Sequence, residues 1–235
     1  MIAHCLLIGA TGLLFSVGAF AHDAISAEAR KATLARLDEL RRTSTTASAP
    51  AERATALIEI GKTLDGVRVL LNEDIISHGK TQGLETLMLV NQLNASPHKL
   101  QLSPQTRFYL SDPHYYRDAL TLDPRGKQAL FARFMLLKNH FYDSFVDNPL
   151  KPVKESKEAL LEMITLGESL IVAKDAAVDP EEVHFILAIQ YLKAAESGAL
   201  PKAKCQSRYA ELQKKFKSQW PDSLKLLTLE ALSPS

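Results

Sequence analysis

Hydrophobic residues recur at helical spacing along most of this chain. Apolar side chains three or four positions apart share one face of an α-helix, whereas a strand needs strict alternation. The clearest stripe comprises Leu130, Phe134, Leu137, Phe141 and Phe145. The same spacing predicts helices over 27–42, 57–75, 84–93 and 160–171. No stretch alternates for long between hairpin turn residues, so we expect an all-α fold.

Several of these segments differ in how much of their surface is apolar. Residues 183–189 are apolar nearly all round, which is typical of a central, packed helix. A narrower stripe runs through Cys205, Tyr209, Leu212 and Phe216, and it predicts a buried face. In 84–93 the expected apolar face comprises Leu84, Leu87, Met88 and Leu93.

Proline follows Ser or Asp at regular points of the chain. Such a pair suits a helix start, because the Ser or Asp side chain caps free N–H groups and proline lacks one. The pairs are Ser96-Pro97, Ser103-Pro104, Asp112-Pro113, Asp123-Pro124 and Asp179-Pro180. The short intervals predict antiparallel helical hairpins, stacked as a short α-solenoid or an irregular bundle. We expect helical parts at 22–95 and 96–235 within one continuous domain.

The segment from Met1 to Ala21 is typical of an export signal. It contains no Asp, Glu, Lys or Arg, includes an apolar run, and ends in Ala19-Phe20-Ala21. Small residues at these positions predict cleavage after Ala21 and a periplasmic or secreted protein. The missing Lys or Arg leaves a second interpretation open, an uncleaved N-terminal membrane anchor. Membrane association is expected only in that case.

Charge and cysteine content narrow the function classes. The chain has 28 basic and 27 acidic residues, and this balance gives no reason to expect nucleic-acid binding. A stretch of six basic residues near 202–217 is interpreted as a solvated helix face. Removal of Cys5 with the signal leaves Cys205 alone, so the exported chain has no internal disulfide. We interpret Cys205 as a small core residue.

A local resemblance to a known repeat family covers two short stretches. The pattern Tyr116-x-x-Ala119-Leu120-x-Leu122-Asp123-Pro124 resembles the closing half of a tetratricopeptide repeat. The stretch ending in Trp220-Pro221-Asp222-Ser223 is similar to such a closing turn. The first-helix pattern of the family precedes neither. The resemblance implies stacked helical hairpins and protein binding.

An aromatic region supplies the binding candidates. Aromatic rings with polar tips line ligand pockets and interfaces, although a core around Phe134 is the competing interpretation. The candidates are Tyr109, His114, Tyr115, Tyr116, Arg117 and His140. Among them we expect Tyr109, Tyr115 and Tyr116 to lean towards the surface.

Motifs for catalysis and cofactors are incomplete. Gly61-Lys62-Thr63 and Gly79-Lys80-Thr81 lack the earlier glycine of a phosphate loop. Glu181 and His184 have the spacing of a helical ligand pair without a second pair, and we expect His184 to pack or cap locally. His22 would become a terminal residue that chelates copper, which makes it the one metal candidate.

These observations predict an exported, non-enzymatic helical protein that acts as an interaction or adaptor module in the cell envelope. It would bind a protein partner and need no cofactor. The alternative is a periplasmic accessory protein that binds a small molecule or a metal.

Overall fold

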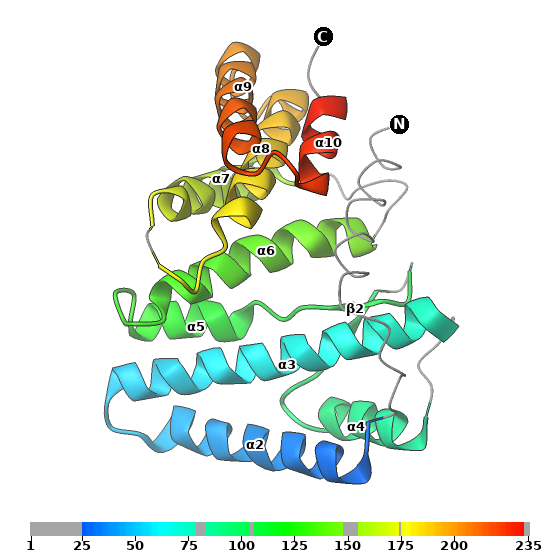
Figure 1. Cartoon of the computed structure of the whole chain (residues 1–235). Coiled ribbons are helices and arrows are strands. Elements are labelled where there is room, and N and C mark those ends of the chain that lie inside the picture. Colours follow the sequence, from blue (N-terminus) through cyan, green and yellow to red (C-terminus); the bar gives the residue numbers. More distant parts are fainter. Residues whose placement is uncertain (1–24, 79–82, 104–105, 148–154, 174, 233–235) are drawn as a thin grey trace. The chain divides into compact units, whose positions relative to one another are not determined.

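The computed structural model describes residues 25–78, 83–103, 106–147, 155–173 and 175–232, and it is mostly helical (Figure 1). The helices are α2 (Ala27–Thr46), α3 (Pro50–His78), α4 (Leu84–Asn94), α5 (His114–Leu122), α6 (Ala129–Asp147), α7 (Lys157–Ile171), α8 (Pro180–Ser197), α9 (Lys202–Gln219) and α10 (Leu224–Ala231). The all-α class predicted from the hydrophobic spacing is confirmed.

The chain divides into two units between Ala132 and Arg133, inside α6. We call the described residues 25–132 the N-terminal unit and the described residues from 133 to 232 the C-terminal unit. The sequence had suggested a division near residue 96. Residues 96–132 belong to the N-terminal unit, because β2 and α5 in this stretch pack against α3.

The N-terminal unit is built around α3. Helix α2 packs along it, α5 and the strand β2 contact it, and α4 contacts α2. Leu37, Ile60, Leu71 and Leu93 are among its fully buried core residues. These side chains come from three helices, and their burial holds this unit together.

A short hairpin, absent from the sequence prediction, lies beside α3. Strand β1 (Gln101–Leu102) pairs with β2 (Tyr109–Leu110) in antiparallel register. The Asn72 side chain accepts the Tyr109 N–H at 2.7 Å and donates to the Tyr109 carbonyl at 2.9 Å. One amide of α3 thus satisfies both backbone groups of Tyr109. Strands of two residues are too short to give an alternating sequence signal.

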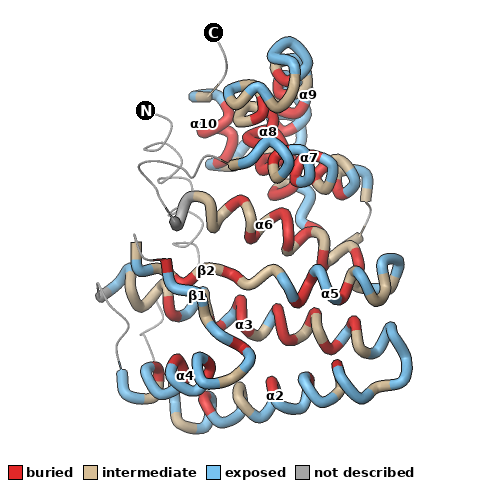
Figure 2. The backbone as a smooth tube through the Cα atoms, turned by 180° about the vertical axis from the view of Figure 1, so that it is seen from behind, coloured by how far each residue is buried: buried red, intermediate tan, exposed pale blue. Residues whose placement is uncertain are grey.

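The C-terminal unit is centred on α8. Helices α7, α9 and α10 all contact it, and every residue from Glu182 to Tyr191 is buried (Figure 2). The central helix predicted from residues 183–189 is therefore confirmed. Helix α9 places Cys205, Tyr209, Leu212 and Phe216 in the core, as its stripe predicted. Burial raises the pKa of the Cys205 thiol, as expected for a core cysteine rather than a reactive one.

The prediction for α4 is largely wrong. Leu84, Leu87 and Met88 are exposed, and the buried positions are Thr86, Leu89, Val90 and Leu93. Leu93 is the one member of the expected face that lies in the core. The helix is apolar on several sides, so spacing alone did not identify the side that packs.

The proline rule holds at one site and fails at two. The Asp179 side chain accepts the N–H groups of Glu181 and Glu182 with Pro180 as the first helical residue, as predicted. At Asp112 the carboxylate accepts the N–H of His114, and α5 begins at His114 rather than at Pro113. No helix begins at Pro97 or Pro124, because an irregular segment leads from Pro97 into β1 and turns follow Pro124. Pro104 lies outside the described residues.

Within the described residues, no helix combines the length and apolar character needed to span a membrane. The export segment, its cleavage site and His22 lie outside the described residues, so these expectations remain predictions.

Candidate functional site

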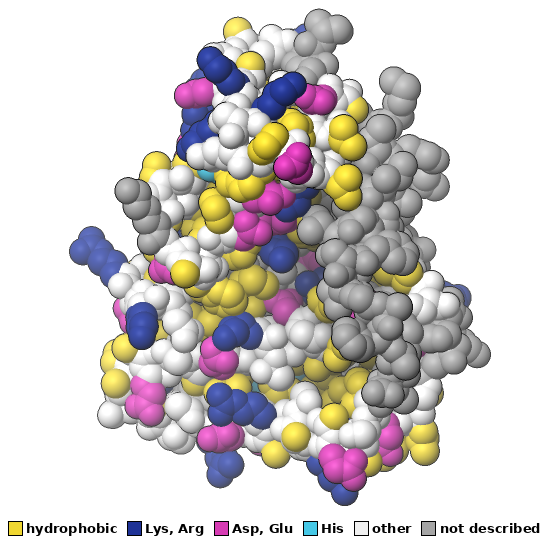
Figure 3. Space-filling view, viewed as in Figure 1, with side chains coloured by type: hydrophobic (Ala, Val, Ile, Leu, Met, Phe, Trp, Pro, Cys, Tyr) yellow, Lys and Arg dark blue, Asp and Glu magenta, His cyan; other side chains and the backbone are white. Residues whose placement is uncertain are grey.

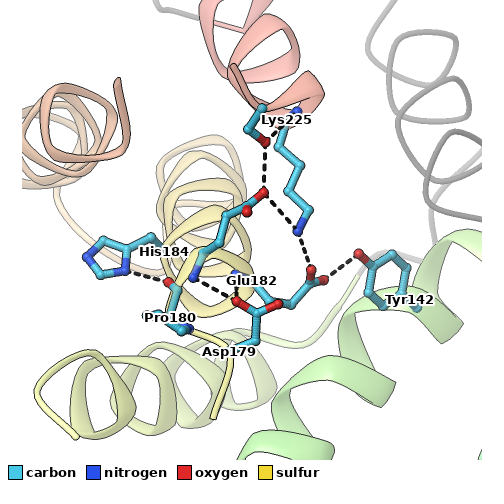
Figure 4. Close-up of polar contacts among 8 residues, drawn as sticks. Tyr142, Asp179, Pro180, Glu182, His184 and Lys225 are labelled. Carbon is cyan, nitrogen blue, oxygen red and sulfur yellow. Dashed lines mark hydrogen bonds and ion pairs between the residues drawn. The ribbon is translucent and has the colours of Figure 1, made fainter. Parts of the chain in front are cut away.

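The most concentrated group of buried charges lies in the C-terminal unit, where α6, α8 and α10 meet (Figure 4). Helix α8 contributes Glu182, α10 contributes Lys225, and α6 contributes Tyr142. Glu182 is 3% exposed and Lys225 is 5% exposed. Ionisable groups this deeply buried are rare in proteins and need partners, so this cluster is the first candidate for a functional site.

Local sequence places the acidic side of the cluster at the start of α8. Asp179 caps the helix, and Glu181 and Glu182 occupy its first turn, where the helix dipole favours negative charge. Ser223 caps α10 and thereby sets the position of Lys225 two residues later. The two helix starts therefore meet with opposite charges.

Every member of the cluster has a partner. Lys225 Nζ lies 2.5 Å from Glu182 Oε2 and 3.4 Å from Glu181 Oε1. The Tyr142 hydroxyl donates to Glu182 Oε1, and the Ser223 hydroxyl donates to Glu181 Oε1 at 2.7 Å. The ammonium also lies 5.9 Å from the centre of the Phe185 ring. This distance is short enough for a cation–π contact.

These contacts favour the protonated forms of Lys225 and Tyr142. Burial alone would lower the pKa of Lys225, but the carboxylates of Glu182 and Glu181 outweigh it and raise the pKa, since nearby opposite charge favours the charged form. Burial, and then the Glu182 charge, raise the pKa of Tyr142. A protonated lysine and a protonated tyrosine are poor nucleophiles and poor bases, so the arrangement suits a structural tie better than catalysis.

His184 lies near the start of α8 and is engaged locally, as predicted. Its Nδ1 lies 2.7 Å from the Pro180 carbonyl oxygen. A carbonyl can only accept, so Nδ1 carries the hydrogen. The His184 ring packs edge-on against Trp220 at 5.1 Å between centres. Glu181 contacts Ser223 and Lys225 instead, so the two residues with ligand-pair spacing are divided between two sets of contacts.

A second cluster of the same kind involves the later part of α8. The Tyr191 hydroxyl donates to Glu168 at 2.8 Å, and Arg208 donates to both oxygens of Glu168 at 2.8 and 2.7 Å. Arg208 also donates to Glu211 at 2.7 Å. Burial opposes ionisation of Glu168, but these donors prevail and lower the pKa of its carboxyl. Arg208, one of the six basic residues predicted to form a solvated face on α9, is therefore paired with Glu168.

A third cluster lies in the N-terminal unit. The hydroxyl of Tyr116, on α5, donates to Asp65 of α3 at 2.7 Å, and Arg68 contacts the other carboxylate oxygen at 3.4 Å. The Tyr116 ring lies against Gly61, where an added Cβ would come within 2.8 Å of Cζ. The sequence Gly61-Lys62-Thr63 lies within α3. Gly61 has no side chain, and this leaves room for the Tyr116 ring. Gly79-Lys80-Thr81 lies outside the described residues.

The expectation that Tyr109, Tyr115 and Tyr116 lean towards the surface is wrong. All three are buried, because each finds polar partners inside the unit. Tyr116 binds Asp65, and Tyr109 is held through its backbone by Asn72. The Tyr115 hydroxyl lies 2.6 Å from His98, and its ring stacks on His114 at 3.7 Å between centres.

The remaining candidates belong to different units, and one of them, His114, lies against Tyr115. His114 and Arg117 are exposed on α5. His140 belongs to the C-terminal unit, where its Nε2 lies 2.9 Å from Glu155. Glu155 also lies 2.5 Å from Lys193. Burial disfavours its charge, yet the bonds from His140 and Lys193 lower its pKa.

A small hollow lies in the described part of the N-terminal unit. It has a volume of about 10 Å³ and is lined by Gly61, Leu64, Asp65, Arg68, Lys99, Leu100, Leu110, Ser111 and Asp112. This volume suits a single water molecule. Among the described residues, no three His, Cys, Asp or Glu side chains converge as metal ligands. Neither observation favours the small-molecule or metal alternative.

Sequence reasoning missed Tyr142, Glu182 and Lys225 as a group. Glu182 is one of two acids in the first turn of α8, a common position for acidic residues, and Lys225 lies in an apolar run that gives no distinct stripe. The one available signal was the position of Lys225 between leucines. An amphipathic helix normally keeps lysine on its outer face, so a lysine within an apolar run is unusual. Its partner, 43 positions earlier, left no trace in local spacing.

No protein-family model, curated protein or solved structure matches this chain. The resemblance to tetratricopeptide repeats therefore rests on its two sequence stretches alone.

Proposed function

We propose that this chain is an exported, non-enzymatic helical protein that binds a protein partner in the cell envelope. The observation that carries the proposal is the exposure of two leucines on α10. Lys225 lies inside the unit, whereas Leu224 and Leu227 are 65% and 63% exposed. In the space-filling view, hydrophobic side chains lie over α10 among charged ones (Figure 3). Apolar side chains clustered at a surface favour an interface.

The closed chemistry of the buried clusters supports the non-enzymatic part of the proposal. Each carboxylate of the clusters described above is bound by a cation and by a hydroxyl or imidazole. The polar atoms of these groups are therefore used in contacts within the protein. An active site would instead present a titratable group to an open cleft.

The expected partner is a protein with an apolar helix or strand that covers Leu224 and Leu227. The stretch similar to a repeat-closing turn, Trp220 to Ser223, directly precedes α10. The resemblance implies protein binding for such folds. Export through cleavage after Ala21 is part of the proposal, and a mature mass that begins at His22 would support it.

Position-specific photo-crosslinking in the producing cell tests the proposal. A photoreactive amino acid replaces Leu224, Leu227 or, as a matched control, the exposed Ser218 of α9. We expect one common crosslinked protein from both α10 positions and none from position 218. The Leu224→Ser/Leu227→Ser variant should reduce the complex about tenfold, since both leucines lose apolar burial. Equal crosslinking at all three positions, or none at α10, would refute it.

A further inference from the structure

The segment between α4 and β1 is held down by one buried histidine. His98 is 4% exposed, and its Nδ1 lies 2.6 Å from the hydroxyl of Tyr115 on α5. The His98 backbone N–H donates to Ser96 at 3.1 Å, and the Leu100 N–H donates to Asn94 at 3.1 Å. The side chain of His98 thus connects residues 95–100 to a different helix.

Only one of the two nitrogens of the His98 ring has a hydrogen-bond partner. Burial, and then the Asp112 charge, raise the pKa of Tyr115 to about 12, so its hydroxyl keeps its proton. Burial, and then Arg41, lower the pKa of His98, which favours the neutral ring. The hydroxyl can donate to Nδ1 or accept from it. Nε2 is buried without a hydrogen-bond partner.

The charged groups around His98 do not favour a second proton on its ring. Helix α2 contributes Arg41, which disfavours it, and Asp38, which favours it less strongly. From the start of α5, His114 also disfavours it, and the Asp112 carboxylate already lies 2.5 Å from His114 Nδ1. Asp118 influences Tyr115 rather than the His98 ring.

A protonated His98 would carry two donors, and one of them has no partner. Nδ1–H could donate to the Tyr115 hydroxyl, but Nε2–H would be buried without an acceptor. A buried donor without an acceptor destabilises the folded state, and a charged one does so most. Movement of the ring into water hydrates its charge and supplies an acceptor for Nε2–H, and this movement breaks the bond to Tyr115.

We propose that His98 is an acid-operated latch whose protonation breaks its bond to Tyr115 and releases residues 95–100 from α5. The latch is independent of the proposed protein-binding function, because it lies in the N-terminal unit and that function rests on α10. Release would expose Tyr115 and loosen the entry to the β1–β2 hairpin.

The sign of the pH effect follows from the direction of the shift. The folded state binds the His98 proton more weakly than the unfolded chain does. The stability from the latch is therefore present above the ordinary histidine pKa of 6.5. It is lost as the pH falls from there through the lowered pKa of the folded state.

Hydrogen exchange on the full chain tests the latch, with rates corrected for the intrinsic effect of pH. Between about pH 7.5 and about pH 5 we expect protection of residues 95–102 to fall about tenfold. His98→Gln should remove this pH dependence, whereas the control His140→Gln, in the C-terminal unit, should retain it. An unchanged fall in His98→Gln, or no fall in the wild type, would overturn the proposal.

A second measurement protects the test against a poorly folded variant. The His98 ring signal in the wild-type protein, titrated by nuclear magnetic resonance, should give a pKa below 6.5. A value at or above that limit would overturn the latch, because the folded state would then hold the proton as well as the unfolded chain does.

Discussion

The two units each bury a tyrosine, a carboxylate and a cation, but they assemble them differently. In the N-terminal unit Asp65 and Arg68 lie one turn apart on α3, and only Tyr116 comes from another helix. In the C-terminal unit Tyr142, Glu182 and Lys225 come from three helices. The first pair can form within a single helix, whereas the second exists only when α8 and α10 are packed. The same chemistry is a local feature in one unit and a tertiary tie in the other.

The largest expected effect comes from removal of Lys225. Lys225→Met leaves the Glu182 charge buried beside Tyr142, and breaking a buried pair costs about 3–5 kcal/mol. The contact between Arg68 and Asp65 is longer, at 3.4 Å. Arg68→Met is therefore expected to cost less, about 1–2 kcal/mol. Urea unfolding curves measure both.

The exposed pair between Lys217 and Glu230 supplies the control for that experiment. Lys217→Met should change the free energy of unfolding by only about 0.5 kcal/mol, since exposed pairs are weak. If Lys225→Met were no worse than this control, the description of Lys225 as a tie between α8 and α10 would be wrong.

The next largest effect is expected at two glycines, each of which lies where a side chain from another helix comes close. Gly61→Ala places a Cβ 2.8 Å from the Tyr116 ring, which Asp65 holds in place. This overpacking should cost up to about 3 kcal/mol. Gly167→Ala meets the flexible end of Leu187 at 2.9 Å and should cost less.

A second glycine of α3, Gly66, supplies the control for these two. Gly66→Ala meets nothing within 4 Å. It should stabilise α3 by about 0.5–1 kcal/mol, because alanine loses less conformational freedom in a helix. Thermal unfolding of the three variants should place Gly61→Ala lowest and Gly66→Ala highest. A different order would contradict the fixed position of the Tyr116 ring.

Removal of the hydroxyls compares the clusters directly. Tyr116→Phe and Tyr142→Phe each take a donor from a buried carboxylate, and each should cost about 1–2 kcal/mol. The hydroxyl lies on a separate helix in both units, so we expect similar losses in urea unfolding. A loss in only one unit would show that the two clusters differ in more than the origin of their cation.

The smallest effect is a pH dependence at Tyr191. Burial and the bond to Glu168 raise its pKa to about 12 from the ordinary 10.0. The folded state therefore holds the proton more tightly, and this stability is present below the ordinary pKa and lost as the pH rises through the raised one. Between about pH 9 and about pH 11 the wild type should lose more stability in urea than Tyr191→Phe. Equal losses would contradict the raised pKa.

Local patterns predicted those features that depend on neighbouring positions along the chain. The Cys205 stripe, the buried α8 and the Asp179 cap each follow from spacing or from a helix end. The burial of Tyr116 does not follow from local patterns, because its partner Asp65 lies 51 positions away. The same holds for Lys225 and Glu182. A polar residue placed outside by local rules moves inside when a distant helix satisfies it.

Helices α4 and α10 show a second limit of hydrophobic spacing as a guide to the buried face. Both have leucine on more than one side, so hydrophobic spacing offers two faces of nearly equal quality. In α4 the buried face includes Thr86, and in α10 it includes Lys225 and Thr228. The choice of face was made by packing against α2 and by the Glu182 carboxylate, which are tertiary facts.

The clamp of Asn72 on Tyr109 has a consequence for how molecules of this protein meet in concentrated solution. A sheet edge with unpaired N–H and C=O groups invites the strands of other molecules and is a common start of aggregation. Because one side-chain amide occupies both groups of Tyr109, β2 offers no such template at that residue. A single asparagine on α3 thus takes the place of a further strand and protects the hairpin from self-association.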